Sequence, residues 1–200
     1  MIAIIDYGMG NIASVLKAIR SLEKDVVITF NKKEIQKASL IVLPGVGSFE
    51  QGMKNLKDRG LVDLLYQEVI QNKKPFLGIC LGMQLIMEKG SEPNECRGLG
   101  WIKGTVEPIV NSRFPVPHLG WNKVYQFGEE NQEDTLLNNF YFVHSFHVIP
   151  EEKVESSYVD YEFKIVASIK KENIYATQFH PEKSQKAGLH LLKSYIESYA

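Results

Sequence analysis

Short apolar runs alternate with segments of helical periodicity through the first half of the chain. Four of these runs lie at 2–5, 26–30, 40–43 and 76–79. Runs that are apolar almost throughout are typical of strands buried on both faces, as in a parallel sheet covered by helices. Helices are predicted between and after them, at 12–22, 34–37, 61–69 and 81–88. Repeated βα units of this kind predict an α/β fold with a mainly parallel, doubly wound sheet.

The second half of the chain has a different pattern. Aromatic residues, prolines and alternating runs fill 98–166, which indicates antiparallel strands and loops. The apolar runs 165–169 and 174–179 flank a polar turn and predict a hairpin. An amphipathic helix from 187 to 199 closes the chain, and the acidic run 129–134 is expected in a surface loop. The sequence contains no linker or internal repeat, so we predict one domain spanning 1–200.

Composition and charge exclude several classes of function. The chain has 200 residues and a formal net charge of −1, without a basic block, so nucleic acid is a poor candidate for a partner. The sequence contains no signal-peptide pattern and no apolar window of roughly 18 to 20 residues, so we expect no membrane span. Two cysteines do not make a disulfide framework, which favours a reducing, cytoplasmic setting. His144 and His147 lack a third ligand at metal-binding spacing, and we expect neither a metal nor a cofactor.

Cys80 lies between two glycines at a predicted strand-to-helix junction, in the run Gly78-Ile79-Cys80-Leu81-Gly82. A lone cysteine at a strand end is most often a small core residue. Glycine on both sides instead allows a sharp elbow and a close backbone approach, and helix N-terminal amides favour a thiolate there. We therefore interpret Cys80 as a nucleophile. Cys96, in a polar run without an elbow, has no such context.

His180 follows the last predicted strand, and Glu182 stands two residues later. Proline at 181 keeps His180 out of helical conformation, which marks the end of an element. A histidine can take the proton of a thiol, and a carboxylate can fix the tautomer of that histidine. The sequence thus predicts a Cys80-His180-Glu182 hydrolytic triad. We expect the side chains of His118, His144, His147 and His190 to be structural or exposed.

The loop Pro44-Gly45-Val46-Gly47 follows another apolar strand. In a parallel sheet it lies at the same carboxyl edge as Cys80. It is either an ordinary tight turn or a loop whose backbone amides bind a negative oxygen. In the second case the amide of Leu81 is the second donor.

These motifs resemble class I (triad) glutamine amidotransferases. The resemblance rests on the glycine-flanked cysteine with Gln84 and on the His-Pro-Glu motif at 180–182. Further segments narrow it to the glutaminase subunits of imidazole glycerol phosphate synthases: Asp6 to Asn11, Pro44 to Gly47, Pro117 to Asn122, Tyr141 to Ser145 and His180 to Ser184. The resemblance covers the chain from its first strand to its last helix and implies a flavodoxin-like α/β domain.

The resemblance also implies a reaction. The Cys80 thiolate attacks the carboxamide of glutamine, the loop from Gly45 to Gly47 and the Leu81 amide hold the oxyanion, and His180 protonates the departing ammonia. Water then hydrolyses the glutamyl thioester. Gln84 and the backbone around His144 and Ser145 hold the glutamine.

The implied partner is a (βα)8-barrel cyclase that receives the ammonia in a heterodimer. Docking makes chemical sense because free ammonia protonates in water and stops being a nucleophile. The residues expected at that interface are Asn11, Trp121, Asn122, Lys183 and Ser184.

The sequence departs from the subfamily pattern at Leu119, Phe146 and Trp101. These departures leave open a paralogue that supplies ammonia to a sugar-amidating enzyme. Two other classes are a stand-alone cysteine peptidase or γ-glutamyl hydrolase, and a non-enzymatic scaffold. Labelling of Cys80 by a glutamine-like electrophile separates the scaffold from the enzymes, and turnover of γ-glutamyl peptides identifies the hydrolase.

Overall fold

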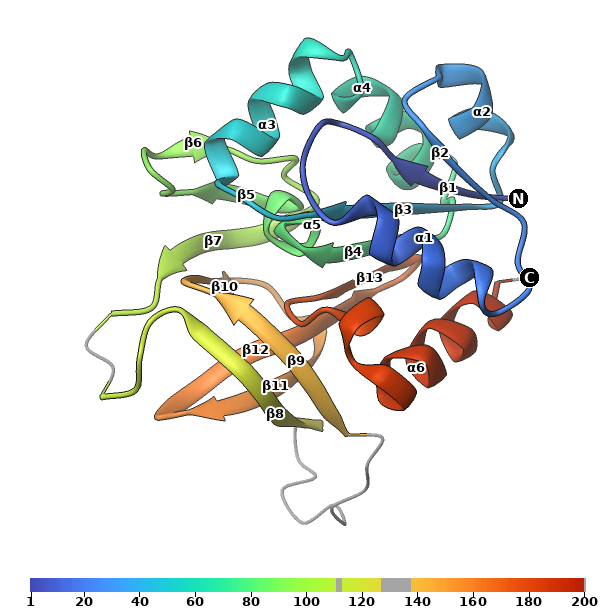
Figure 1. Cartoon of the computed structure of the whole chain (residues 1–200). Coiled ribbons are helices and arrows are strands. Elements are labelled where there is room, and N and C mark those ends of the chain that lie inside the picture. Colours follow the sequence, from blue (N-terminus) through green and yellow to red (C-terminus); the bar gives the residue numbers. More distant parts are fainter. Residues whose placement is uncertain (111–112, 127–137, 200) are drawn as a thin grey trace.

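A nine-stranded mixed sheet forms the centre of the computed structural model, which describes residues 1–110, 113–126 and 138–199 (Figure 1). Its strand order is β2-β1-β3-β4-β13-β12-β11-β8-β9. The first five strands of that order are parallel to one another: β2 (Val26–Thr29), β1 (Ile2–Ile5), β3 (Leu40–Gly45), β4 (Phe76–Cys80) and β13 (Ile174–Thr177). This is the 2-1-3-4-5 order of flavodoxin-like folds, with β13 in fifth place.

Side chains alternate along the parallel strands, so each face of the sheet has its own apolar core. Ile41 and Leu43 of β3 pack with α2 (Lys32–Lys37), α3 (Phe49–Asp58), α4 (Val62–Leu65) and α5 (Leu81–Leu85). Leu40 and Val42 pack on the other face, with α1 (Ile12–Arg20) and α6 (Gln185–Glu197). A π-helical turn, Tyr66–Gln71, follows α4 directly, and a short 3₁₀ turn, Pro181–Lys183, precedes α6. No helix in the described part of the chain is long and apolar enough to span a membrane.

The second half of the chain forms the antiparallel strands that its alternating pattern predicts. The large sheet continues through β12 (Phe163–Lys171), β11 (Glu155–Tyr161), β8 (His118–Gln126) and β9 (Asn139–His144). A second sheet has the order β10-β7-β5-β6, with β10 (Phe146–Pro150), β7 (Ile102–Pro108), β5 (Met87–Gly90) and β6 (Cys96–Arg97). The predicted hairpin is β12 and β13, which pair antiparallel.

The structure differs from the sequence-based expectation at two helices. The helix predicted at 81–88 ends at Leu85, because the next residues join the second sheet and the Ile86 carbonyl accepts from the backbone amides of Trp101 and Ile102. Helix α3 was not predicted, although its core face is apolar. Asn11 precedes α1 but makes no side-chain cap. The acidic run 129–134 lies outside the described residues.

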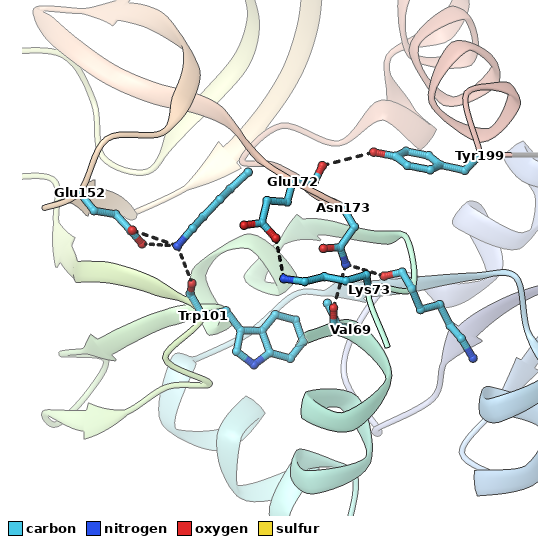
Figure 2. Close-up of polar contacts among 9 residues, drawn as sticks. Val69, Lys73, Trp101, Glu152, Glu172, Asn173 and Tyr199 are labelled. Carbon is cyan, nitrogen blue, oxygen red and sulfur yellow. Dashed lines mark hydrogen bonds and ion pairs between the residues drawn. The ribbon is translucent and has the colours of Figure 1, made fainter. Parts of the chain in front are cut away.

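The turn between β12 and β13 is fixed to the turn that precedes β4 (Figure 2). Asn173 Nδ2 donates to the carbonyls of Val69 and Lys74, both at 2.8 Å, and Lys73 pairs with Glu172 at 2.5 Å. These contacts hold the starting ends of two neighbouring parallel strands in register. The opposite ends of the same strands lead to Cys80 and His180. These contacts therefore help to fix the positions of the two residues relative to each other along the strand direction.

Candidate active site

Cys80 ends β4 in a strained conformation, and α5 begins at the next residue. Its φ is 53° and its ψ is −104°, a region that L-residues rarely adopt, and such strain costs about 1–3 kcal/mol. Gly78 and Gly82 provide the close backbone approach that the sequence predicts, while Cys80 itself takes the unusual dihedrals. A Cβ on Gly82 would lie 1.8 Å from the Leu43 carbonyl oxygen, and one on Gly78 would lie 2.8 Å from the Gly82 carbonyl oxygen.

His180 and Glu182 form a buried pair beside this elbow. His180 Nδ1 lies 2.7 Å from Glu182 Oε1, and both side chains are 1% exposed. Asn11 Nδ2 donates to the same carboxylate oxygen at 3.2 Å, which explains why Asn11 does not cap α1. Burial disfavours the imidazolium, but the neighbouring Cys80 and Glu182 outweigh burial and raise the pKa of His180 to about 10. These neighbours favour the imidazolium form of His180, whose Nε2 has no hydrogen-bond partner among the described residues.

A cavity of about 380 Å³ opens at Cys80. Six of the residues predicted to bind substrate or oxyanion line it: Val46, Gly47, Leu81, Gln84, His144 and Ser145. Gly45 does not line it and instead pairs with Cys80 across β3 and β4. A larger cavity, about 580 Å³, lies between α6 and the antiparallel strands and contains none of the predicted site residues. We therefore place the candidate site in the smaller cavity.

The loop at 44–47 packs tightly against the first loop of the chain. A Cβ on Gly10 would lie 2.6 Å from the Val46 backbone nitrogen, and Gly47 has a φ of +119°. The hydroxyl of Tyr7 is buried beside Gly45 without a hydrogen-bond partner among the described residues. Only glycine fits positions 10 and 47 in this arrangement, and the amide-donor role of the loop stays a prediction.

The residues predicted to contact a partner differ in their exposure. Trp121 is 46% exposed, and Lys183 is exposed with its Nζ 5.7 Å from the Tyr141 ring centre. Asn122 is half-buried and turned toward His118. Ser184 is only 1% exposed, so its side chain does not lie at the surface, and its place at the interface stays a prediction. Its hydroxyl accepts from the Tyr141 amide and donates to the His180 carbonyl, which ties β9 to the histidine.

A model of the glutamine amidotransferase class-I family matches residues 3–197. The chain belongs to this family. Its curated relatives include the imidazole glycerol phosphate synthase subunit HisH 1 of Campylobacter jejuni, 47% identical over 98% of this chain and 99% of that protein. The subunit HisH 2 of Methanococcus maripaludis is 46% identical over the same shares of the two chains.

Solved structures agree with the amidotransferase fold. A crystal structure described as a glutamine amidotransferase superposes with a TM-score of 0.73 at 16% identity, covering 98% of this chain and 97% of that one. The CTPS glutaminase domain of Trypanosoma brucei, with bound acivicin, gives a TM-score of 0.62 at 18% identity, covering 99% and 92%. At these identities the likeness concerns the fold alone.

Polar residues to which the sequence assigned no role in the site lie in the cavity lining or contact residues of that lining. Glu92 lines it, and Glu92 Oε2 accepts from the Phe49 amide at the start of α3. Gln178 lies beside Cys80, and His118 contacts His144. No three histidine, cysteine or acidic side chains gather as a metal site among the residues described. Gln178 adjoins the recognised His-Pro-Glu motif, but its partners come from distant strands, so no local signal indicated its role.

Proposed function

We propose that this amidotransferase is the glutaminase subunit of an imidazole glycerol phosphate synthase and releases ammonia from glutamine for histidine biosynthesis. The near full-length identity of 41–47% to curated subunits of that synthase carries the proposal. The cavity at Cys80, with the buried His180-Glu182 pair beside it, supports the glutaminase chemistry.

In the proposed reaction the Cys80 sulfur bonds to the carboxamide carbon of glutamine. The oxygen becomes an oxyanion, which backbone amides of the loop 45–47 and of Leu81 stabilise at the start of α5. The imidazolium of His180, held by Glu182, gives a proton to the leaving nitrogen, and ammonia departs. Water then attacks the thioester, the carbon–sulfur bond breaks, and glutamate leaves.

Glu92 is proposed to bind the α-ammonium of the substrate. Glu92 lines the cavity and is half-buried, and this burial raises the pKa of its carboxyl group. Gln84 Nε2 is already used inside the protein, where it donates to Phe146 and Gln178. Glu92 is therefore the acidic side chain in the cavity lining that can pair with an ammonium.

Glu92→Gln is expected to raise the KM for glutamine about tenfold or more and to change kcat little. The neutral amide keeps the acceptor for the Phe49 amide but loses the charge-assisted hydrogen bond. Steady-state glutaminase kinetics measure both parameters. Glu50→Gln is the matched control, since Glu50 is a neighbouring acid outside the cavity lining. An unchanged KM for Glu92→Gln would place the ammonium elsewhere.

The proposed partner is a (βα)8-barrel cyclase in a cytoplasmic heterodimer. Exposed apolar side chains occur in the cavity lining and on the strand that follows it: Val46 lines the cavity at 38% exposure, and Leu119 and Trp121 are exposed on β8, which begins directly after the lining residue Pro117. A partner seated on this face would cover the cavity and receive ammonia without its release to water. Trp121 and Lys183 are the predicted contacts that the structure leaves exposed.

The decisive experiment is glutaminase activity of this chain with the histidine-pathway cyclase, with and without the ribotide ligand of that cyclase. Strong stimulation that depends on the ligand is expected. Absent stimulation, with Cys80 still labelled by a glutamine-like electrophile, would point to a sugar-amidating acceptor enzyme instead. Rapid hydrolysis of γ-glutamyl peptides by the isolated chain would contradict the amidotransferase proposal.

A further inference from the structure

Gln178 holds its amide group against the sulfur of Cys80. The side chain is fully buried at the end of β13, and its Nε2 lies 3.6 Å from Cys80 Sγ, within hydrogen-bonding distance for sulfur. Amide groups are ambiguous in orientation, because oxygen and nitrogen are nearly equivalent in shape. Whether Gln178 presents a donor or an acceptor to the sulfur depends on its other neighbours.

Gln84 decides the orientation of Gln178. Gln84 Nε2 lies 3.1 Å from the Phe146 carbonyl oxygen, which can only accept, so this end of the Gln84 amide must be the nitrogen. The same nitrogen lies 3.1 Å from Gln178 Oε1 and donates to it. Gln178 therefore has its oxygen toward Gln84 and its N–H toward Cys80.

His144 is the second donor to this carbonyl, and His118 fixes the tautomer of His144. His144 Nδ1 lies 2.9 Å from the Phe146 oxygen and must carry the proton. Burial lowers the pKa of His144 to about 3, so the ring is neutral and its Nε2 accepts. His118 Nδ1 donates to that Nε2 at 2.9 Å. Burial likewise lowers the pKa of His118 to about 4, so its Nε2 accepts from Asn122 Nδ2 at 2.6 Å.

We propose that Gln178 acts directly on the nucleophile, its N–H stabilising the Cys80 thiolate, and that Gln84 and His144 are positioning residues that keep this N–H in place. The inference rests on the proposed role of Cys80 as nucleophile. The donor serves twice. It favours the thiolate before attack, and it stabilises the sulfur again when water adds to the thioester, the carbon–sulfur bond breaks and its electron pair returns to sulfur.

The test measures the rate at which iodoacetamide alkylates Cys80 in the full chain from pH 5 to 10. Peptide mass spectrometry distinguishes Cys80 from Cys96. Gln178→Met removes the donor at similar side-chain length and is expected to slow alkylation at pH 7 about tenfold, with the rate profile moved to higher pH. Thr177→Val is the matched control: the adjacent, equally buried residue loses its hydrogen bond to the Phe179 carbonyl but does not contact the sulfur. Cys96 is an internal control in every sample.

A shift confined to Cys80 in Gln178→Met supports the proposal. An unchanged Cys80 profile in Gln178→Met, or an equal shift in Thr177→Val, overturns it and leaves the proposed function standing. A Cys80 that does not react in the unmodified protein overturns both. If Gln178→Met does not fold, NMR of the unmodified protein decides. The chemical shift of the Gln178 side-chain amide is expected to change with pH over the same range in which the rate of Cys80 alkylation changes. A chemical shift that stays constant over that range contradicts the proposal.

Discussion

Cys80→Ala is expected to lower glutamine-dependent synthesis by the complex with its cyclase about 10⁴-fold or more, while ammonia-dependent synthesis stays intact. Without the sulfur no thioester forms, and the His180-Glu182 pair cannot replace the nucleophile. Ammonia added from solution reaches the cyclase without this site. The measurement compares the rate of cyclase product formation with glutamine and with an ammonium salt as nitrogen source.

Cys96→Ala is the control for this prediction, because Cys96 lies in the second sheet and lines no part of the Cys80 cavity. It is expected to retain both activities. Loss of both activities in Cys80→Ala would show that Cys80 supports the fold or the complex rather than the chemistry. Thermal unfolding of each variant checks that the comparison concerns folded proteins.

Gly82→Ala is expected to lower the free energy of unfolding by more than about 3 kcal/mol. The added Cβ would lie 1.8 Å from the Leu43 carbonyl oxygen, a backbone atom within the central strand β3. Neither α5 nor β3 can yield without disturbing the elbow that presents Cys80, so glutaminase activity should fall with stability. Urea unfolding followed by tryptophan fluorescence measures the change.

Gly52→Ala is the matched control, because Gly52 lies in α3 and packs against the same helix α5. Its Cβ would meet only the ends of the Leu81 and Leu85 side chains, at 3.2 Å, and flexible side chains can move by tenths of an ångström. Alanine also favours helix more than glycine does, by about 1 kcal/mol. The control should stay within about 1 kcal/mol of the unmodified protein. A Gly82→Ala variant as stable as the unmodified protein would contradict the close packing of α5 against β3.

Much of the fold followed from local pattern. The strands at 2–5, 26–29, 40–45 and 76–80 lie where apolar runs predicted them. Three of them are buried throughout, and a strand buried on both faces must be apolar almost throughout, while the edge strand 26–29 is partly exposed. The hairpin of β12 and β13 was predicted from two apolar runs that flank a polar turn, and the last helix from the amphipathic spacing of its apolar residues. The helix at 81–88 was predicted too long, since its apolar residues serve equally well as a buried strand, and only pairing with β7 decides between the two.

By itself the sequence predicted the elbow at Cys80 and made the pairing of His180 with Glu182 possible, because both depend on residues within one short segment, and the structure shows that pair at 2.7 Å. It also determined the family. The tertiary structure alone decided that Ser184 is buried, that Asn11 binds Glu182, and that Gln178 turns its N–H toward Cys80. Those contacts join residues 43, 171 and 98 positions apart, and the orientation of Gln178 depends further on Gln84, 94 positions away. Strand order and register bring such residues together, and no local pattern of the chain encodes that proximity.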